Sequence, residues 1–233
     1  MNRQLLAAMA ILGVASLGQG KARPNFSLMN VGSFHKGEVS ARSGERWLGL
    51  VQNGAESSWK FFPVEVKAVK DPLLDEEGGK TGTEVKVLGG EPLFLVRGAD
   101  QLAGKKVKTA RFSPLGPMIA DQDPIQLSCL DCKGVLKLRL IDVKRGDGDT
   151  GRTSRLVLEG EGISQTLYEW PEGFDDQHCT LIWAGDLNGD GKIDLFMNLS
   201  DHYNVQQMTL LLSSKGQRES LVERVAVFRT TGC

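Results

Sequence analysis

The sequence predicts an all-β protein, arranged as a sandwich or a barrel of antiparallel sheets, and three observations support this prediction. About a dozen short runs of aliphatic or β-branched residues alternate with polar residues, as half-buried strands do. Clusters of Gly, Asp, Asn or Pro separate the runs at nearly regular spacing, which is typical of sandwiches and barrels. After the N-terminal segment, no capped amphipathic helical pattern stands out.

The expected strands fall into two groups along the chain. We place the boundary near residue 120, in the stretch LGPMIADQDPIQ, between an N-terminal β region (residues 23–120) and a C-terminal β region (residues 121–233). The N-terminal region carries the runs 46–51, 59–69, 83–90, 92–98 and 106–112. The C-terminal region carries the runs 134–143, 155–161, 164–170, 180–185, 193–200, 208–214 and 224–231.

Residues 1–22 have the pattern of a secretory signal peptide. Arg3 supplies a positive start, an uncharged apolar stretch runs from Leu5 to Leu17, and small residues follow it. The stretch is shorter than the ~20 apolar residues of a membrane span, and no later segment reaches that length. A buried N-terminal helix is the alternative, but the polar, Pro-containing stretch that follows does not continue a helix. We therefore expect an exported bacterial protein, located in the periplasm or outside the cell.

The composition excludes some classes of partner. The chain has 28 Lys and Arg residues against 29 Asp and Glu residues, for a net charge of −1. No basic stripe of the kind that binds nucleic acid stands out, and we expect Lys105, Lys106 and Lys108 to form a solvated strand face. Nucleic acid is therefore not an expected partner.

The four cysteines are Cys129, Cys132, Cys179 and Cys233. In an oxidising compartment an even number suggests two disulfides, and three pairings are possible. We favour the pairing Cys129–Cys132 with Cys179–Cys233. The second bridge would close a loop of roughly 55 residues and stabilise the folded state by about 3 to 4 kcal/mol in the chain-entropy model. A zinc site that adds His178 and a redox-active CxxC pair are the alternatives, although IQLSCLDCKGVLKL runs from strand to strand and not within a βαβ unit.

One short stretch, GDLNGDGKIDLF at residues 185–196, concentrates negative charge. Three carboxylates so close repel one another without a counter-ion, and hard cations such as calcium take six to eight oxygens. Gly191 permits a sharp turn, and the backbone carbonyl of Lys192 can point inward. The alternative is an Asn/Asp/Gly-rich turn that holds no ion. Counted from Asp186, oxygen-bearing side chains occupy positions 1, 3, 5 and 9: Asp186, Asn188, Asp190 and Asp194.

The residues that flank this stretch predict strands. A helix–loop–helix calcium site needs a bidentate Glu at position 12, where this chain has Met197. Beyond the turn, apolar residues recur with a period of two, which indicates a strand. We therefore predict a strand–turn–strand hairpin between Trp183 and Phe196. The residues expected on one face of its second strand are Ile193, Leu195, Met197 and Leu199.

The stretch AGDLNGDGKIDLFM resembles the calcium loop of FG-GAP or VCBS-type repeats, from the integrin-like β-propeller family. That resemblance implies calcium ligation by the Lys192 carbonyl and by four side chains. Propellers repeat the motif in several blades, whereas this chain has it once, so the resemblance extends to the loop and not to the propeller. The surrounding C-terminal stretch is similar to uncharacterised exported bacterial proteins with one such loop, which implies no activity. The four side chains are those of Asp186, Asn188, Asp190 and Asp194.

Two functions from different classes are compatible with these features. The leading interpretation is an exported, calcium-stabilised β-sheet protein that acts as a non-catalytic binding or envelope-associated module, with a protein or a glycan as partner. The alternative is a secreted hydrolase of envelope polymers with Asp201 and His202 near the ion. Ser200 precedes them, but neighbours in a strand point to opposite faces, so adjacency assembles no triad. The sequence leaves open whether the protein is an enzyme.

Overall fold

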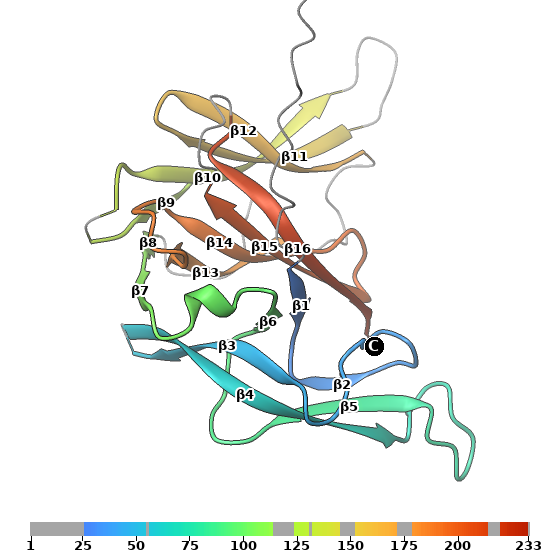
Figure 1. Ribbon diagram of the computed structural model, residues 1–233. Coiled ribbons are helices and arrows are strands. Elements are labelled where there is room, and N and C mark those ends of the chain that lie inside the picture. Colours follow the sequence, from blue (N-terminus) through green and yellow to red (C-terminus); the bar gives the residue numbers. More distant parts are fainter. Residues whose placement is uncertain are drawn as a thin grey trace, which may run out of the picture.

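The computed structural model describes residues 26–54, 56–113, 124–130, 132–144, 152–171, 179–213 and 220–232 (Figure 1). Within these residues, sixteen strands form two sheets, and the one helix is the short 3-10 turn η1 (Asp100–Leu102). Every strand pair recorded there is antiparallel. The predicted all-β class is therefore confirmed.

The larger sheet has 11 strands and curls back on itself like a barrel that is nearly closed. Its terminal strands β1 and β16 lie against each other (Figure 1). Strand β5 pairs with β4 and with β2, outside the main order. The main order is β1 (Ser27–Met29), β6 (Leu95–Arg97), β3 (Arg46–Asn53), β4 (Glu56–Val69), β7 (Lys106–Thr109), β13 (Cys179–Asp186), β14 (Asp194–Leu199), β15 (Val205–Ser213) and β16 (Val222–Thr231). The two additional strands are β2 (Gly32–Phe34) and β5 (Gly82–Val87).

The smaller sheet is a five-stranded meander in which each strand pairs only with its neighbours in sequence. It lies over the layer formed by β13 to β16 (Figure 1). Its order is β12 (Ile163–Trp170), β11 (Arg152–Gly160), β10 (Leu136–Lys144), β9 (Ile125–Ser128) and β8 (Arg111–Ser113).

All twelve predicted runs contain strands, and the run 106–112 contains two. Strand β7 belongs to the larger sheet and β8 to the smaller one, and the chain changes sheet at Ala110, whose N–H donates to the carbonyl of Ala184 (2.8 Å). The sequence did not reveal β1, β2 and β9, which have three or four residues each. A period of two is not visible over so short a stretch.

Two of the predicted boundaries lie outside the described residues. The predicted signal peptide, residues 1–22, is one of them. The predicted boundary near residue 120 falls in 114–123, and the pairs β7–β13 and β8–β9 join strands from before and after it. The division at that point stays a prediction. In the described part of the chain, no helix is long and apolar enough to span a bilayer.

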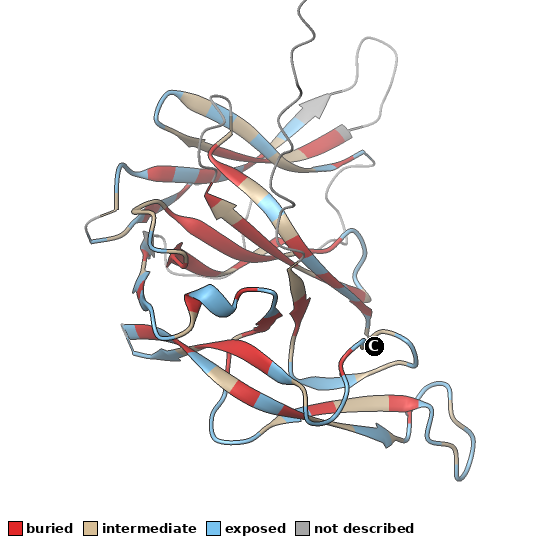
Figure 2. Ribbon diagram, viewed as in Figure 1, coloured by how far each residue is buried: buried red, intermediate tan, exposed pale blue. Residues whose placement is uncertain are grey.

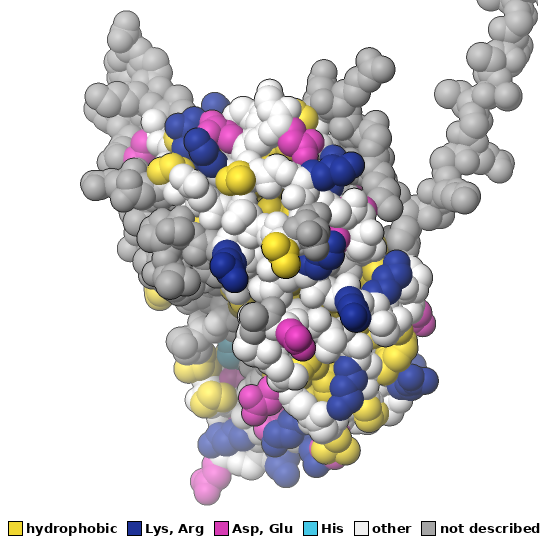
Figure 3. All heavy atoms as spheres, turned by 90° about the vertical axis from the view of Figure 1, so that its left-hand side faces the viewer, with side chains coloured by type: hydrophobic (Ala, Val, Ile, Leu, Met, Phe, Trp, Pro, Cys, Tyr) yellow, Lys and Arg dark blue, Asp and Glu magenta, His cyan; other side chains and the backbone are white. Residues whose placement is uncertain are grey.

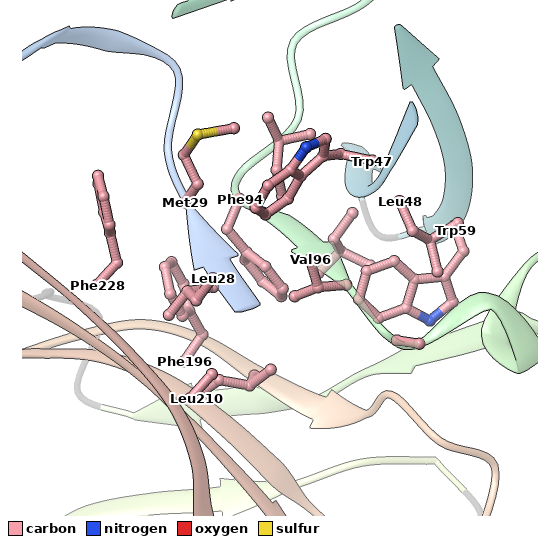
Figure 4. Packing of buried hydrophobic residues seen from close by; sticks show 14 of the residues in the cluster. Leu28, Met29, Trp47, Leu48, Trp59, Phe94, Val96, Phe196, Leu210 and Phe228 are labelled. Carbon is pink, nitrogen blue, oxygen red and sulfur yellow. The ribbon is translucent and has the colours of Figure 1, made fainter. Parts of the chain in front are cut away.

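The central strands β13 and β14 are buried on both faces (Figure 2). One face packs against the N-terminal strands, where the ring of Phe196 lies 4.2 Å from that of Phe94 between centroids (Figure 4). The other face packs against the smaller sheet. The predicted alternation is confirmed, because four apolar residues of this hairpin share the second face: Ile193, Leu195, Met197 and Leu199.

A partly buried ion pair joins the residue that follows β2 to the segment that follows β4. The Asp71 carboxylate, whose side chain is 1 % exposed, lies 2.5 Å from His35 Nδ1. Its other oxygen accepts the N–H groups of Leu73 and Leu74. The hydrogen bond between the two side chains raises the pKa of His35 and lowers the pKa of Asp71.

These pKa shifts predict how stability depends on pH. The raised pKa of His35 contributes stability that is complete below about pH 6.5 and is lost as the pH rises through the pKa of the folded protein. The lowered pKa of Asp71 contributes stability above about pH 4 that is lost on acidification. We expect wild type to melt about 2 to 4 °C above His35→Gln at pH 6, and this difference to shrink at pH 8.5. Calorimetric scans of both proteins at both pH values test this, and a constant difference would contradict it.

Candidate metal centre

The predicted strand–turn–strand hairpin is confirmed. Strand β13 ends at Asp186, residues 187–193 form the turn, and β14 begins at Asp194, with Gly185 paired to Asp194 across the hairpin. Gly191 has a φ of +79°, a backbone conformation that side chains disfavour, as expected for a sharp turn. Gly185 is required for a different reason, because a Cβ atom there would collide with the carbonyl oxygen of Lys108 in the neighbouring strand β7.

The turn is wrapped around the carboxylate of Asp186, which is 3 % exposed. Its Oδ1 accepts the N–H groups of Gly189 (2.6 Å) and Asp190 (3.1 Å), and its Oδ2 accepts that of Gly191 (3.0 Å). Three successive amides therefore point toward one carboxylate, which fixes the path of the turn.

Asp194 is fully buried at the start of β14. Its Oδ2 accepts the N–H of Leu187 (2.7 Å), which closes the turn, and its Oδ1 accepts the N–H of Ser213 (2.6 Å), which ties the hairpin to β15. Burial raises the pKa of Asp194 to about 7, and the nearby charge of Asp190 acts in the same direction. The hydrogen bonds from Ser213 and Leu187 act in the opposite direction.

Ser213 is a member of this site that the sequence analysis missed. Its hydroxyl donates to Asp190 Oδ2 (2.5 Å) and lies 3.4 Å from Asn188 Nδ2. Asn188 Oδ1 accepts the N–H of Asp190 (3.0 Å). Ser213 ends β15, 19 residues beyond Asp194, so no local spacing rule marks it. Only the pairing of β14 with β15 brings it to the turn.

The fifth predicted ligand is the backbone carbonyl of Lys192, and its inward orientation stays a prediction. The N–H of Lys192 donates to Asp190 Oδ1 (2.9 Å), and its ammonium group lies 3.8 Å from Glu161 Oε2 at the surface. Among the described residues, no Lys, Arg or His side chain forms an ion pair with Asp186, Asp190 or Asp194. Within the described residues, these three carboxylates therefore accept from amide and hydroxyl groups, and the Lys105 ammonium reaches the turn only at the carbonyl of Asn188.

The chemistry of the donor set fits a hard cation. An ionised carboxylate has about four lone-pair positions. The hydrogen bonds of Asp186, Asn188, Asp190 and Asp194 leave roughly six acceptor positions across the four side chains. Calcium takes six to eight oxygens, with carbonyls and water among them. No three His, Cys, Asp or Glu side chains in the described ranges lie together as a ready metal-binding group, so the ligand set stays a prediction.

Three separate segments hold the turn from outside. The indole N–H of Trp59 in β4 donates to the carbonyl of Leu187 (3.0 Å). The backbone N–H of Lys133 donates to the carbonyl of Gly191 (2.9 Å). The Lys105 ammonium lies 3.4 Å from the carbonyl of Asn188. The turn is thus connected to β4, to the segment before β7 and to the β9–β10 connection.

The predicted disulfide Cys129–Cys132 is present, with Cα atoms 5.2 Å apart. Cys179 lies in β13 and is buried without a disulfide partner among the described residues, and burial raises the pKa of its thiol to about 12. Its predicted partner Cys233 and the zinc-site candidate His178 both lie outside the described residues. The bridge Cys179–Cys233 stays a prediction.

The structure does not bring Asp201 and His202 to the turn. They follow β14, whose six residues span roughly 20 Å, whereas the turn precedes it. Asp201 forms an exposed ion pair with Arg229 (2.9 Å), and His202 Nδ1 lies 2.6 Å from Asn204 Oδ1. The Ser200 hydroxyl donates to the backbone carbonyl of His202 and not to its ring. These contacts are those of a polar loop that is tied to β16 through Arg229.

No family model, curated protein sequence or solved structure significantly matches the chain. The likeness to FG-GAP or VCBS-type loops therefore rests on residues 186–194 themselves.

The close approach of β7 to the hairpin gives a test of this geometry. In Gly185→Ala, the added methyl group meets the Lys108 carbonyl and the Trp183 ring, and we expect the free energy of unfolding to fall by about 2 to 3 kcal/mol. Gly189→Ala is the matched control, because that position has a φ of +77° and nothing within 4 Å. The control should lose only about 1 kcal/mol. Urea denaturation measures both values, and equal losses would contradict the prediction.

Proposed function

We propose that this chain is an exported, calcium-stabilised β-sheet protein that acts as a non-catalytic binding or envelope-associated module. The observation that carries the proposal is the burial of the Asp186 and Asp194 carboxylates beside Asp190, with no basic side chain paired to them in the described residues. A buried charge is costly unless a partner compensates it. One divalent cation within reach of the three carboxylates would offset most of their negative charge.

Calcium is the cation that this chemistry favours. The donors are carboxylate, amide and carbonyl oxygens, which suit hard cations, whereas zinc prefers His and Cys ligands. Magnesium demands a near-ideal octahedron and keeps several waters, whereas calcium accepts an irregular shell. Here most of the oxygens come from one short segment, residues 186–194, and such an irregular donor set suits the more tolerant ion.

The position of the turn supports a structural role for the ion. Leu187 packs in the core on one face of the β13–β16 layer, and Ile193 packs in the core on the other. A cation bound between them stabilises the hairpin that both cores share. A ligand that binds only the folded state adds about 2.7 kcal/mol when its concentration is 100 times Kd.

Two further observations support the binding module over the hydrolase. Ser200 and His202 make local hydrogen bonds and Asp201 pairs with Arg229 in β16, all at the end of β14 that lies away from the turn. A surface hollow of about 570 Å³ lies between β4, β7 and Leu130, close to the turn that Lys105 contacts. Three lysines, Glu56, hydroxyl groups and apolar side chains line it, a mixture that suits a polar protein segment or a glycan. Figure 3 shows this side of the molecule, where Lys and Arg side chains lie among hydrophobic ones.

Export is supported by two features of the chain. The N-terminal residues have the pattern of a signal peptide, and the bridge Cys129–Cys132 suits an oxidising compartment. Extracellular modules bind calcium at ~0.1 to 1 mM, so weak affinity is sufficient there.

Thermal melting tests the proposal. We expect calcium in large excess over Kd to raise the Tm of wild type by about 5 to 10 °C relative to chelator. Asp190→Ala should abolish this response, because it removes a carboxylate from the turn. Asp100→Ala, an exposed carboxylate in η1, is the control and should respond as wild type does. A wild-type Tm that is the same in calcium, magnesium and chelator would remove the proposal.

A further inference from the structure

The disulfide-bridged turn at Cys129–Cys132 is attached directly to the candidate metal loop. Within the bridged turn, the N–H of Cys132 donates to the carbonyl of Cys129 (3.2 Å). The next residue, Lys133, donates its backbone N–H to the carbonyl of Gly191 (2.9 Å). The bridge and the loop are therefore separated by one residue and one hydrogen bond.

That hydrogen bond acts on a peptide unit at the centre of the loop. The carbonyl of Gly191 and the N–H of Lys192 belong to the same planar peptide, whose orientation is rigid. Its carbonyl accepts from Lys133, and its N–H donates to Asp190 Oδ1 (2.9 Å). The Gly191 N–H donates to Asp186 Oδ2 (3.0 Å). Lys133 thus fixes the plane of the Gly191–Lys192 peptide, whose N–H orients the carboxylate of Asp190. The N–H of Gly191, at the start of the same segment, binds Asp186.

We propose that the Cys129–Cys132 bridge controls the calcium affinity of the loop, with Lys133 as the positioning residue. The inference rests on the proposed function and names a regulation of the same site. With the bridge intact, the turn holds the Lys133 amide in place and the loop is preorganised. When the bridge is reduced, the turn regains conformational freedom, and holding the Gly191–Lys192 peptide then costs entropy on binding.

The remaining contacts of the loop do not depend on the bridge. The hydrogen bonds from loop amides to Asp186 and from Leu187 and Ser213 to Asp194 lie within the hairpin or in β15. Reduction therefore weakens calcium binding and does not abolish it. A loss of one positioned hydrogen bond corresponds to about a five- to tenfold weaker affinity.

The bridge is placed where a reductant can reach it. Leu130, at the tip of the bridged turn, is 84 % exposed, and both cysteines are only partly buried. A dithiol such as dithiothreitol breaks the S–S bond by thiolate attack through a mixed disulfide. It leaves two protonated cysteine thiols and is itself oxidised to a cyclic disulfide. By linkage, calcium must make the bridge harder to reduce by the same factor, and tenfold equals about 30 mV for this two-electron couple.

Calcium titration by calorimetry tests the inference, with oxidised wild type compared with the double variant Cys129→Ser, Cys132→Ser. We expect the Kd of the double variant to be about five- to tenfold higher. In oxidised protein, Lys133→Pro removes the amide donor and should raise the Kd by a similar factor, with little further change on reduction. Lys133→Ala keeps the donor and should bind as wild type does.

The outcomes separate the two proposals. If oxidised wild type binds no calcium, the proposed function fails and the inference fails with it. If wild type binds calcium and both the double variant and Lys133→Pro bind it equally well, the inference is overturned and the proposed function stands. If far-UV circular dichroism shows that the double variant is unfolded, Lys133→Pro with its bridge intact decides between these outcomes.

Discussion

The burial of the β13–β15 layer on both faces is the constraint on which the rest of the structure depends. Trp183 and Phe196 face the core shared with the N-terminal strands, while Leu181 and Leu195 face the core shared with the smaller sheet. Neither core is complete without this layer. The hairpin turn of residues 187–193 lies at the end of this layer. A change in the turn therefore affects the packing of both cores.

The strand pattern could be predicted from the sequence because each strand carries its own periodicity. The run that contains Phe196 was recognised from its alternation, and the run that contains Trp183 from its apolar residues between turn signals. What the sequence does not encode locally is the partner of each face. Phe196 and Met197 are expected to face opposite sides of β14, yet both are buried. The reason is that a different group of strands packs on each face of β14. The change of sheet at Ala110 likewise has no local signature.

The candidate site also has features that the local sequence predicts and features that depend on tertiary packing. Spacing identified Asp186, Asn188, Asp190 and Asp194, because a turn of fixed length brings such positions together whatever the rest of the chain does. The full burial of Asp194 and the contacts of Ser213 depend on strand pairing over 19 residues, which spacing does not reveal. Lys133 and Trp59, which also bind the turn, are still farther from it in the sequence. Pattern therefore finds the donors, whereas the packing around them determines their environment.

The smaller sheet is an insertion between two strands, β7 and β13, that are neighbours in the larger sheet. The larger sheet therefore joins ends separated by about 70 residues, and the entropy of closing such a loop rises only with the logarithm of its length. The five strands of the insertion pair only with sequence neighbours, so they can form by local, rapid contacts. Folding of the meander draws the ends of the insertion closer together, and it thereby shortens the search by which the two halves of the larger sheet meet.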